Sequence, residues 1–147
     1  MLKKHACITI ILFLLIILGG CGGKMTALDV DSVKDKLIQL DYYNDDLLGY
    51  SLAGMSDIGG LINDSWMFCF YDYGDQKEAL DEFISILISD ELDKYVITER
   101  SNYTIYEREE KNYVLFVRVD NTLLWITGPG KDKEEIRSLA RDLGYYT

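Results

Sequence analysis

The residues best equipped for covalent chemistry in this 147-residue chain are three cysteines and a single histidine. Cys21 has the most distinctive surroundings, because it directly follows Gly19 and Gly20 at the end of a long apolar run. A cysteine sulfur is a strong nucleophile as the thiolate, and glycines without side chains let another molecule approach the backbone closely. Cys21 is therefore the cysteine of this chain best placed for a reaction at its sulfur.

The segment before Cys21 has the organisation of a secretory signal peptide. Lys3 and Lys4 give it a positively charged start, and the 12 residues Cys7–Leu18 form an apolar core. An apolar core of about 7–15 residues is typical of a signal peptide. We therefore expect residues 1–20 to be removed during export.

The run Leu18-Gly19-Gly20-Cys21 resembles a lipobox, the motif at which bacterial prolipoproteins are lipidated and then cut by signal peptidase II. The resemblance implies that Leu18 fills the peptidase's apolar pocket, while Gly19 and Gly20 allow close approach to the bond before Cys21. It implies that Cys21 carries diacylglycerol, with acyl chains such as palmitate, and can carry a further N-acyl chain. In general character the chain is similar to the small lipoproteins of low-GC Gram-positive bacteria.

Two other interpretations of the N-terminus remain open. Residues 6–23 are uncharged and reach the short limit for a membrane-spanning helix, although a glycine within a helix costs roughly 1 kcal/mol. An ordinary signal peptide cut at another bond is the second alternative. Under the lipoprotein interpretation, two or more acyl chains hold the protein stably on the outer face of the cytoplasmic membrane.

The lipoprotein interpretation divides the chain into three parts. Residues 1–20 are the signal peptide, residues 21–28 are a lipidated terminus and tether, and residues 29–147 are one small domain. A flexible tether of this length spans roughly 15 Å, so the domain works close to the membrane. The chain is acidic, with a net charge of −10 that excludes binding to the phosphate backbone of nucleic acid.

The exported part of the chain lacks most catalytic options. The only histidine, His5, lies in the removed segment, which excludes Ser-His-Asp and Cys-His pairs and histidine metal sites. Cys69 has no intramolecular disulfide partner, and its apolar surroundings predict a small core side chain. The sequence therefore predicts no catalytic, metal or cofactor-binding residue and no cofactor other than the lipid on Cys21.

Hydrophobic periodicity predicts an α+β fold: a single antiparallel sheet of about four or five strands packed against two or three helices. Asp31 or Ser32 is expected to cap the first helix, Asp75 with Glu78 the second, and Asp132 with Glu135 the last. The expected helices are 29–40, 76–92 and 132–143, and the expected strands are 50–53, 65–71, 103–108, 113–119 and 122–127.

Three segments carry residues that could bind a ligand or act on one. Asp41–Asp46 supplies oxygen ligands suited to Ca²⁺, but it lacks EF-hand spacing, and a solvated turn is the favoured interpretation. Glu107, Glu109 and Glu110 are the densest carboxylates near a strand end, as a glycosidase-type mechanism requires. Gly54–Gly60 is expected to be an irregular loop, and it lacks the lysine of a phosphate-binding loop.

We therefore expect a non-catalytic, extracytoplasmic protein that binds an envelope protein or a wall component. The 11 tyrosines support this expectation, because exposed tyrosines are good contact residues for proteins and glycans. Two alternatives remain: a carboxylate-dependent hydrolase of cell-wall glycans, and a carrier of a small apolar ligand. The carrier would need an apolar cavity between the sheet and its helices.

Overall fold

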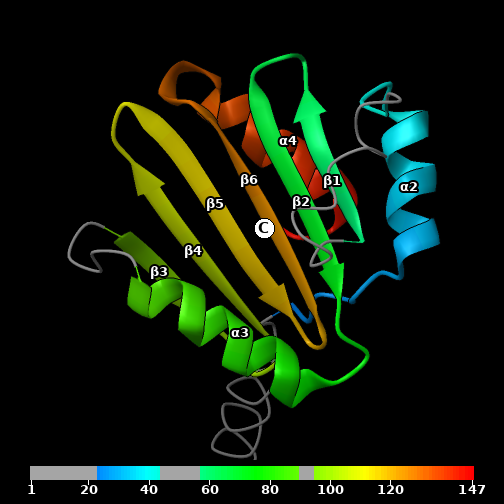
Figure 1. Cartoon of the computed structure of the whole chain (residues 1–147), viewed down its shortest axis with the longest axis vertical. Helices are drawn as coiled ribbons and strands as arrows, with labels where there is room; N and C mark the ends of the chain where they lie inside the picture. Colours follow the sequence, from blue (N-terminus) through cyan, green and yellow to red (C-terminus); the bar gives the residue numbers. More distant parts are fainter. Residues whose placement is uncertain (1–22, 44–56, 90–94) are drawn as a thin grey trace, which may run out of the picture.

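Six antiparallel strands form one sheet with the order β1-β2-β6-β5-β4-β3. The computed structural model of the chain describes residues 23–43, 57–89 and 95–147. Helices α2 and α4 pack on one side of the sheet and α3 crosses the other, giving three layers (Figure 1). The helices and strands are α2 Val30–Gln39, β1 Ile58–Ile62, β2 Trp66–Asp72, α3 Gln76–Ser89, β3 Tyr95–Glu99, β4 Tyr103–Glu109, β5 Asn112–Val119, β6 Thr122–Pro129, the short 3₁₀ helix η3 Gly130–Asp132, and α4 Lys133–Leu143.

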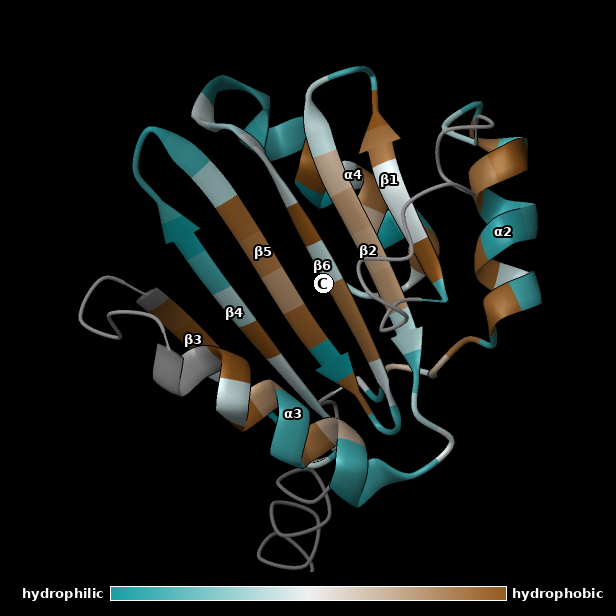
Figure 2. Cartoon of the chain, viewed as in Figure 1, coloured by the Kyte–Doolittle hydropathy of each residue, from teal (hydrophilic) through white to brown (hydrophobic). Residues whose placement is uncertain are grey.

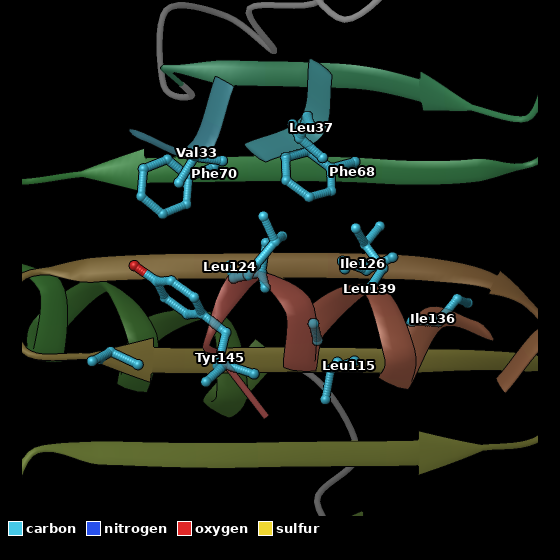
Figure 3. Packing of buried hydrophobic residues seen from close by; sticks show 14 of the residues in the cluster. Val33, Leu37, Phe68, Phe70, Leu115, Leu124, Ile126, Ile136, Leu139 and Tyr145 are labelled. Atoms are coloured by element: carbon cyan, nitrogen blue, oxygen red, sulfur yellow. The ribbon is translucent and has the colours of Figure 1, made fainter. Parts of the chain in front are cut away.

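The side of the sheet under α2 and α4, called here the α2/α4 face, holds the larger core. Side chains alternate between the two faces of a strand, so every second residue of β2, β5 and β6 points to this side. Figure 3 shows Val33 and Leu37 of α2 over Phe68 and Phe70. From α4, the predicted stripe of Ile136, Leu139, Ala140 and Leu143 is buried, which confirms the periodicity of the last helix.

The opposite side, called the α3 face, holds a smaller core under α3. Phe83 of α3 stacks on Phe116 of β5, with ring centroids 4.6 Å apart. Cys69 lies in this cluster with no exposed surface, as the sequence predicted for a core side chain. Burial raises the pKa of its thiol, which keeps the sulfur protonated and unreactive.

The predicted α+β class and single antiparallel sheet are confirmed, but the sheet has six strands instead of four or five. The five-residue strand β3 was missed entirely, and β1 lies where an irregular loop was expected. Gly59 and Gly60 concealed β1, because glycine is depleted in strands and gives no alternating pattern. Both glycines pair with β2, opposite Cys69 and Phe68. The strand predicted at 50–53 lies outside the described residues.

The predicted cap residue of α3 is confirmed, that of α2 is wrong, and Asp132 occupies the predicted N-cap position of α4 without the side-chain bond of a cap. Asp75 accepts hydrogen bonds from the backbone N–H groups of Lys77 and Glu78. In α2 the cap is Asp29, which accepts from the N–H of Ser32 at 2.7 Å. Asp132 makes no side-chain cap bond, because its carboxylate instead accepts from the indole N–H of Trp66 at 3.0 Å.

Candidate functional site

The residues of the expected lipidation site, Leu18, Gly19, Gly20 and Cys21, lie outside the described part of the chain. The same holds for most of the acidic segment Asp41–Asp46, of which only residues 41–43 are described. Among the described residues, no three carboxylate, cysteine or histidine side chains gather closely enough to hold a metal ion. The described helices also include none that is long and apolar enough to cross a membrane.

Glu107 is the candidate catalytic carboxylate with the most elaborate surroundings. It lies on β4 and points to the α2/α4 face, where Tyr113, Arg137 and Tyr146 surround it. Arg137 donates from Nε and Nη2 to Glu107 Oε1 at 2.9 and 2.8 Å, and Tyr146 donates at 3.1 Å. The hydroxyl of Tyr113 donates to the same oxygen. Glu107 is therefore held by three donor side chains from three separate parts of the chain.

These donors decide the protonation state of Glu107. Burial alone would raise the pKa of the carboxyl, but the hydrogen bonds from Tyr113 and Arg137 and the charge of Arg137 outweigh burial and lower it. Burial and the bond to Glu107 also raise the pKa of Tyr113, so its hydroxyl stays protonated and remains a donor. A general acid needs a raised pKa instead. The cluster thus has the properties of an ion pair that joins α4 and the C-terminal residues to the sheet.

The neighbouring carboxylates do not complete a catalytic pair. Glu109 forms an ion pair with Lys133 of α4. Glu110 is exposed in the turn between β4 and β5, where its backbone N–H donates to the carbonyl of Asn112. A glycosidase needs one carboxyl that stays protonated and a second that stays ionised across a substrate cleft. Glu107 and Glu109 lie on the same face of β4, and each forms an ion pair with a basic side chain of α4.

The basic side chains of α4 and two tyrosines alternate along this face. Lys133 and Arg137 lie 5.7 and 5.6 Å from the ring centre of Tyr113, and Arg137 and Arg141 lie 5.5 and 5.2 Å from that of Tyr146. Each such contact contributes about 0.5–1 kcal/mol when exposed and more when dry. The arrangement stabilises the packing of α4 and occupies the basic groups that an anionic ligand would need.

The α3 face is different, because α3 extends over only part of it. Figure 1 shows α3 crossing the lower half of the sheet, near the turn between β5 and β6. Above α3 in this view, a row of side chains runs across the sheet, and each member is the register partner of the next one on the neighbouring strand. This open row consists of Leu61, Met67, Thr127, Val114 and Arg108.

The open row is largely apolar and accessible to solvent. Leu61 is 45% exposed, and the other four members are half-buried. A hollow of about 230 Å³ lies at one end of the row, lined by Leu61, Met67 and Thr127 together with Pro129 and others. Figure 2 shows that hydrophobic colour continues along β2, β6 and β5 beyond the area that α3 crosses. An apolar surface with a polar rim is typical of a site that contacts another protein.

Trp125 lies between the core under α3 and the open row. Its ring is 6.1 Å from that of Phe116, and the side chain is only half-buried. Its indole nitrogen is buried but has no hydrogen-bond acceptor in the described part of the chain. Trp66 on the other face, by contrast, is fully buried and bonded to Asp132. Of the two tryptophans, only Trp66 therefore lies completely inside the protein.

Sequence reasoning singled out Glu107 but not the open row. Strand β1 supplies Leu61, and the glycines that concealed β1 concealed this residue as well. One usable signal was the pair Asn63-Asp64 between two apolar segments, because Asn and Asp tolerate the positive φ of tight turns. Both residues adopt it, with φ of 51° and 55°.

Comparison with known proteins gives no match, whether to family models, to curated proteins or to solved structures.

Proposed function

We propose that the chain is a lipoprotein of the outer face of the cytoplasmic membrane, without catalytic activity, which binds another envelope protein through the open row. The single observation that carries the binding role is this row, where Leu61 is 45% exposed and Met67 and Val114 are only half-buried, whereas the opposite face of the same strands is largely buried. The lipid anchor rests on the sequence from Leu18 to Cys21 and on the charged and apolar segments before it.

The chemistry of the open row favours a protein partner over a wall glycan. Leu61, Met67 and Val114 are aliphatic or thioether side chains, which are suited to apolar contact. Methionine in particular adapts its shape to a partner and is enriched at protein interfaces. Glycan sites instead need several polar groups that bond sugar hydroxyls, and in this row only Thr127 and Arg108 are polar.

The other two functions have less support. Glu107 and Glu109 both pair with cations, and the lowered pKa of Glu107 opposes the role of general acid. A carrier would need space between the sheet and its helices, but that region is filled by fully buried side chains such as Phe68, Leu124 and Leu139 (Figure 3).

The anchor is tested by the intact mass of the protein extracted from bacterial membranes. We expect a species that begins at Cys21 and carries the mass of acyl chains, and we expect Cys21→Ser to lose both features. An unprocessed and unlipidated mass would contradict the anchor and support a retained membrane helix over residues 6–23.

The binding surface is tested with a photo-crosslinking amino acid at Leu61 in cells that make the protein. Ile38 of α2 is the matched control, because it is also a large apolar residue, 51% exposed against 45% for Leu61. We expect a discrete protein adduct from position 61 that disappears when Met67→Asp is added, and none from position 38. Equal crosslinking from both positions would contradict the proposed surface, and an adduct sensitive to a wall-glycan hydrolase would replace the protein partner with a glycan.

A further inference from the structure

We infer that the anchor holds the domain in one orientation, with the turn between β5 and β6 toward the bilayer and the open row at the far end. This inference rests on the proposed lipidation of Cys21. It adds the surface that faces the lipid and the direction in which the binding surface points.

The first step is that the chain becomes fixed to the domain only four residues after Cys21. The side chain of Met25 is 7% exposed and belongs to the core of the α2/α4 face. Its carbonyl accepts a hydrogen bond of 2.7 Å from Asn102 Nδ2. Three residues further on, the N–H of Leu28 donates to the hydroxyl of the fully buried Tyr145 at 3.1 Å. Residues 25–28 are therefore part of the packed domain, and the tether is shorter than the sequence suggested.

The second step is the place at which Met25 is fixed. Asn102, which binds its carbonyl, lies in the turn between β3 and β4 and also donates to Asp120 Oδ2 at 3.1 Å. Asp120 lies in the turn between β5 and β6. Figure 1 shows the chain from residue 23 crossing this lower end of the sheet before α2 begins. The lipidated end thus joins the domain at the end of the sheet opposite the open row.

The third step compares two lengths. The four Cα–Cα steps from Cys21 to Met25 can span at most about 14 Å when fully extended. Strand β5, Asn112–Val119, is about 23 Å long at about 3.3 Å per residue. An inverted domain would place Met25 farther from the bilayer than the tether can reach. The tether is therefore too short for the end of the sheet with the open row to contact lipid while the end that holds Met25 points away from the bilayer.

The charge of the near end is the fourth step. Asp57 accepts from the N–H of Asp72, Asp72 accepts from Asn121, and Asp120 accepts from Asn102, so three carboxylates lie at this end. Anionic headgroups repel carboxylates, so this end does not bind the bilayer surface by charge. We conclude that the acyl chains alone hold the domain, and that the short tether alone sets its orientation.

Two exposed turn positions at opposite ends of β4 make a matched test. Ser101 lies in the turn before β4 and Lys111 in the turn after it. Single cysteines at either position can be labelled in the lipidated protein, because Cys69 is buried and Cys21 is acylated. The labelled proteins are reconstituted into phosphatidylglycerol and phosphatidylethanolamine vesicles that contain a headgroup-attached energy acceptor.

We expect clearly more efficient energy transfer from Ser101→Cys than from Lys111→Cys. Inserting 12 Gly and Ser residues after Gly22 should reduce this difference strongly, because a flexible tether no longer restricts the domain. Equal or reversed efficiencies without the insertion would overturn the orientation, including the case of a domain that lies flat on its open row. If neither variant is retained by the vesicles, the proposed lipid anchor itself fails, which separates the two outcomes.

Discussion

The two faces of the sheet differ in how fully they are buried. On the α2/α4 face, two helices and the C-terminal residues cover the sheet, and side chains such as Phe68, Leu124 and Ile126 have no exposed surface. On the α3 face a single helix covers one half and leaves the open row accessible (Figure 1). Since both faces belong to the same strands, the difference arises from the helices and not from the sheet. Folding stability therefore depends mainly on one face, and the other can contact a partner without unfolding.

The largest expected effect is a difference in folding stability when the same substitution, Leu to Ala, is made on each of the two faces. Leu124→Ala removes a fully buried side chain from the α2/α4 face and should destabilise the protein by about 3–5 kcal/mol through lost burial and a residual cavity. Leu61→Ala in the open row should cost below about 1 kcal/mol, because 45% of the residue is already exposed.

Urea denaturation followed by circular dichroism measures both variants of this pair. Unchanged dependence on denaturant concentration would show that the substitutions alter the native contacts and not the unfolded state. A loss of several kcal/mol for Leu61→Ala would mean that the open row contributes to the core in solution, and the proposed binding surface would lose its basis.

The ion pair of Glu107 gives the second prediction. Its side chain is 12% exposed and that of Arg137 is 22% exposed, so Glu107→Gln leaves a poorly hydrated guanidinium with only the exposed Glu134 as its counter-charge. We expect a loss of about 2–3 kcal/mol at pH 7, somewhat less than for a fully buried pair. Glu134→Gln is the matched control, because Glu134 also pairs with Arg137 but its side chain is 73% exposed. The control should change stability by below about 1 kcal/mol.

The pH dependence of stability tests the same ion pair independently. The pKa of Glu107 is lower in the folded protein than its ordinary value of 4.5, so the unfolded chain binds the proton more tightly. The stabilisation is therefore fully present above about pH 5 and is lost as the pH falls through the lowered pKa. Glu107→Gln should remove this part of the acid sensitivity. A variant with the unchanged pH dependence of the parent protein would show that Glu107 is not the group responsible.

The parts of the molecule that the sequence predicted well are those where a local pattern is compatible with only one structure. The alternation of Tyr113, Leu115, Val117 and Val119 identified β5 and its buried face, and Asp120 has the positive φ, 47°, expected of a tight hairpin turn. By contrast, Asp132 occupies a position typical of a cap but bonds to Trp66, which is distant in sequence. Whether Asp132 accepts a hydrogen bond from a nearby N–H or from a distant indole depends on tertiary packing, which local residue spacing does not predict.

The candidate site was predictable only in part for the same reason. Glu107 stood out as a carboxylate near a strand end, yet its environment comes from Arg137 and Tyr146, which are 30 and 39 residues away. Those donors lower the pKa of Glu107 and convert a candidate acid into the ionised partner of Arg137. The open row is still less local, because it combines residues of five strands and its accessibility depends on where α3 lies.

The smallest expected effect compares the two tryptophans, one on each face. Trp66→Phe removes the donor to Asp132 and should destabilise the protein by about 1–2 kcal/mol more than Trp125→Phe, since bonds to charged groups contribute about 1.5–3 kcal/mol. Trp125→Phe loses no hydrogen bond described in the structure. It also removes a buried N–H that lacks an acceptor, and this gain offsets part of the stability lost with the packing of the larger ring. The midpoints of thermal unfolding of the two variants give the comparison. Equal losses would mean that Trp125 also bonds an acceptor in solution, and that this part of the α3 face is as complete as the other.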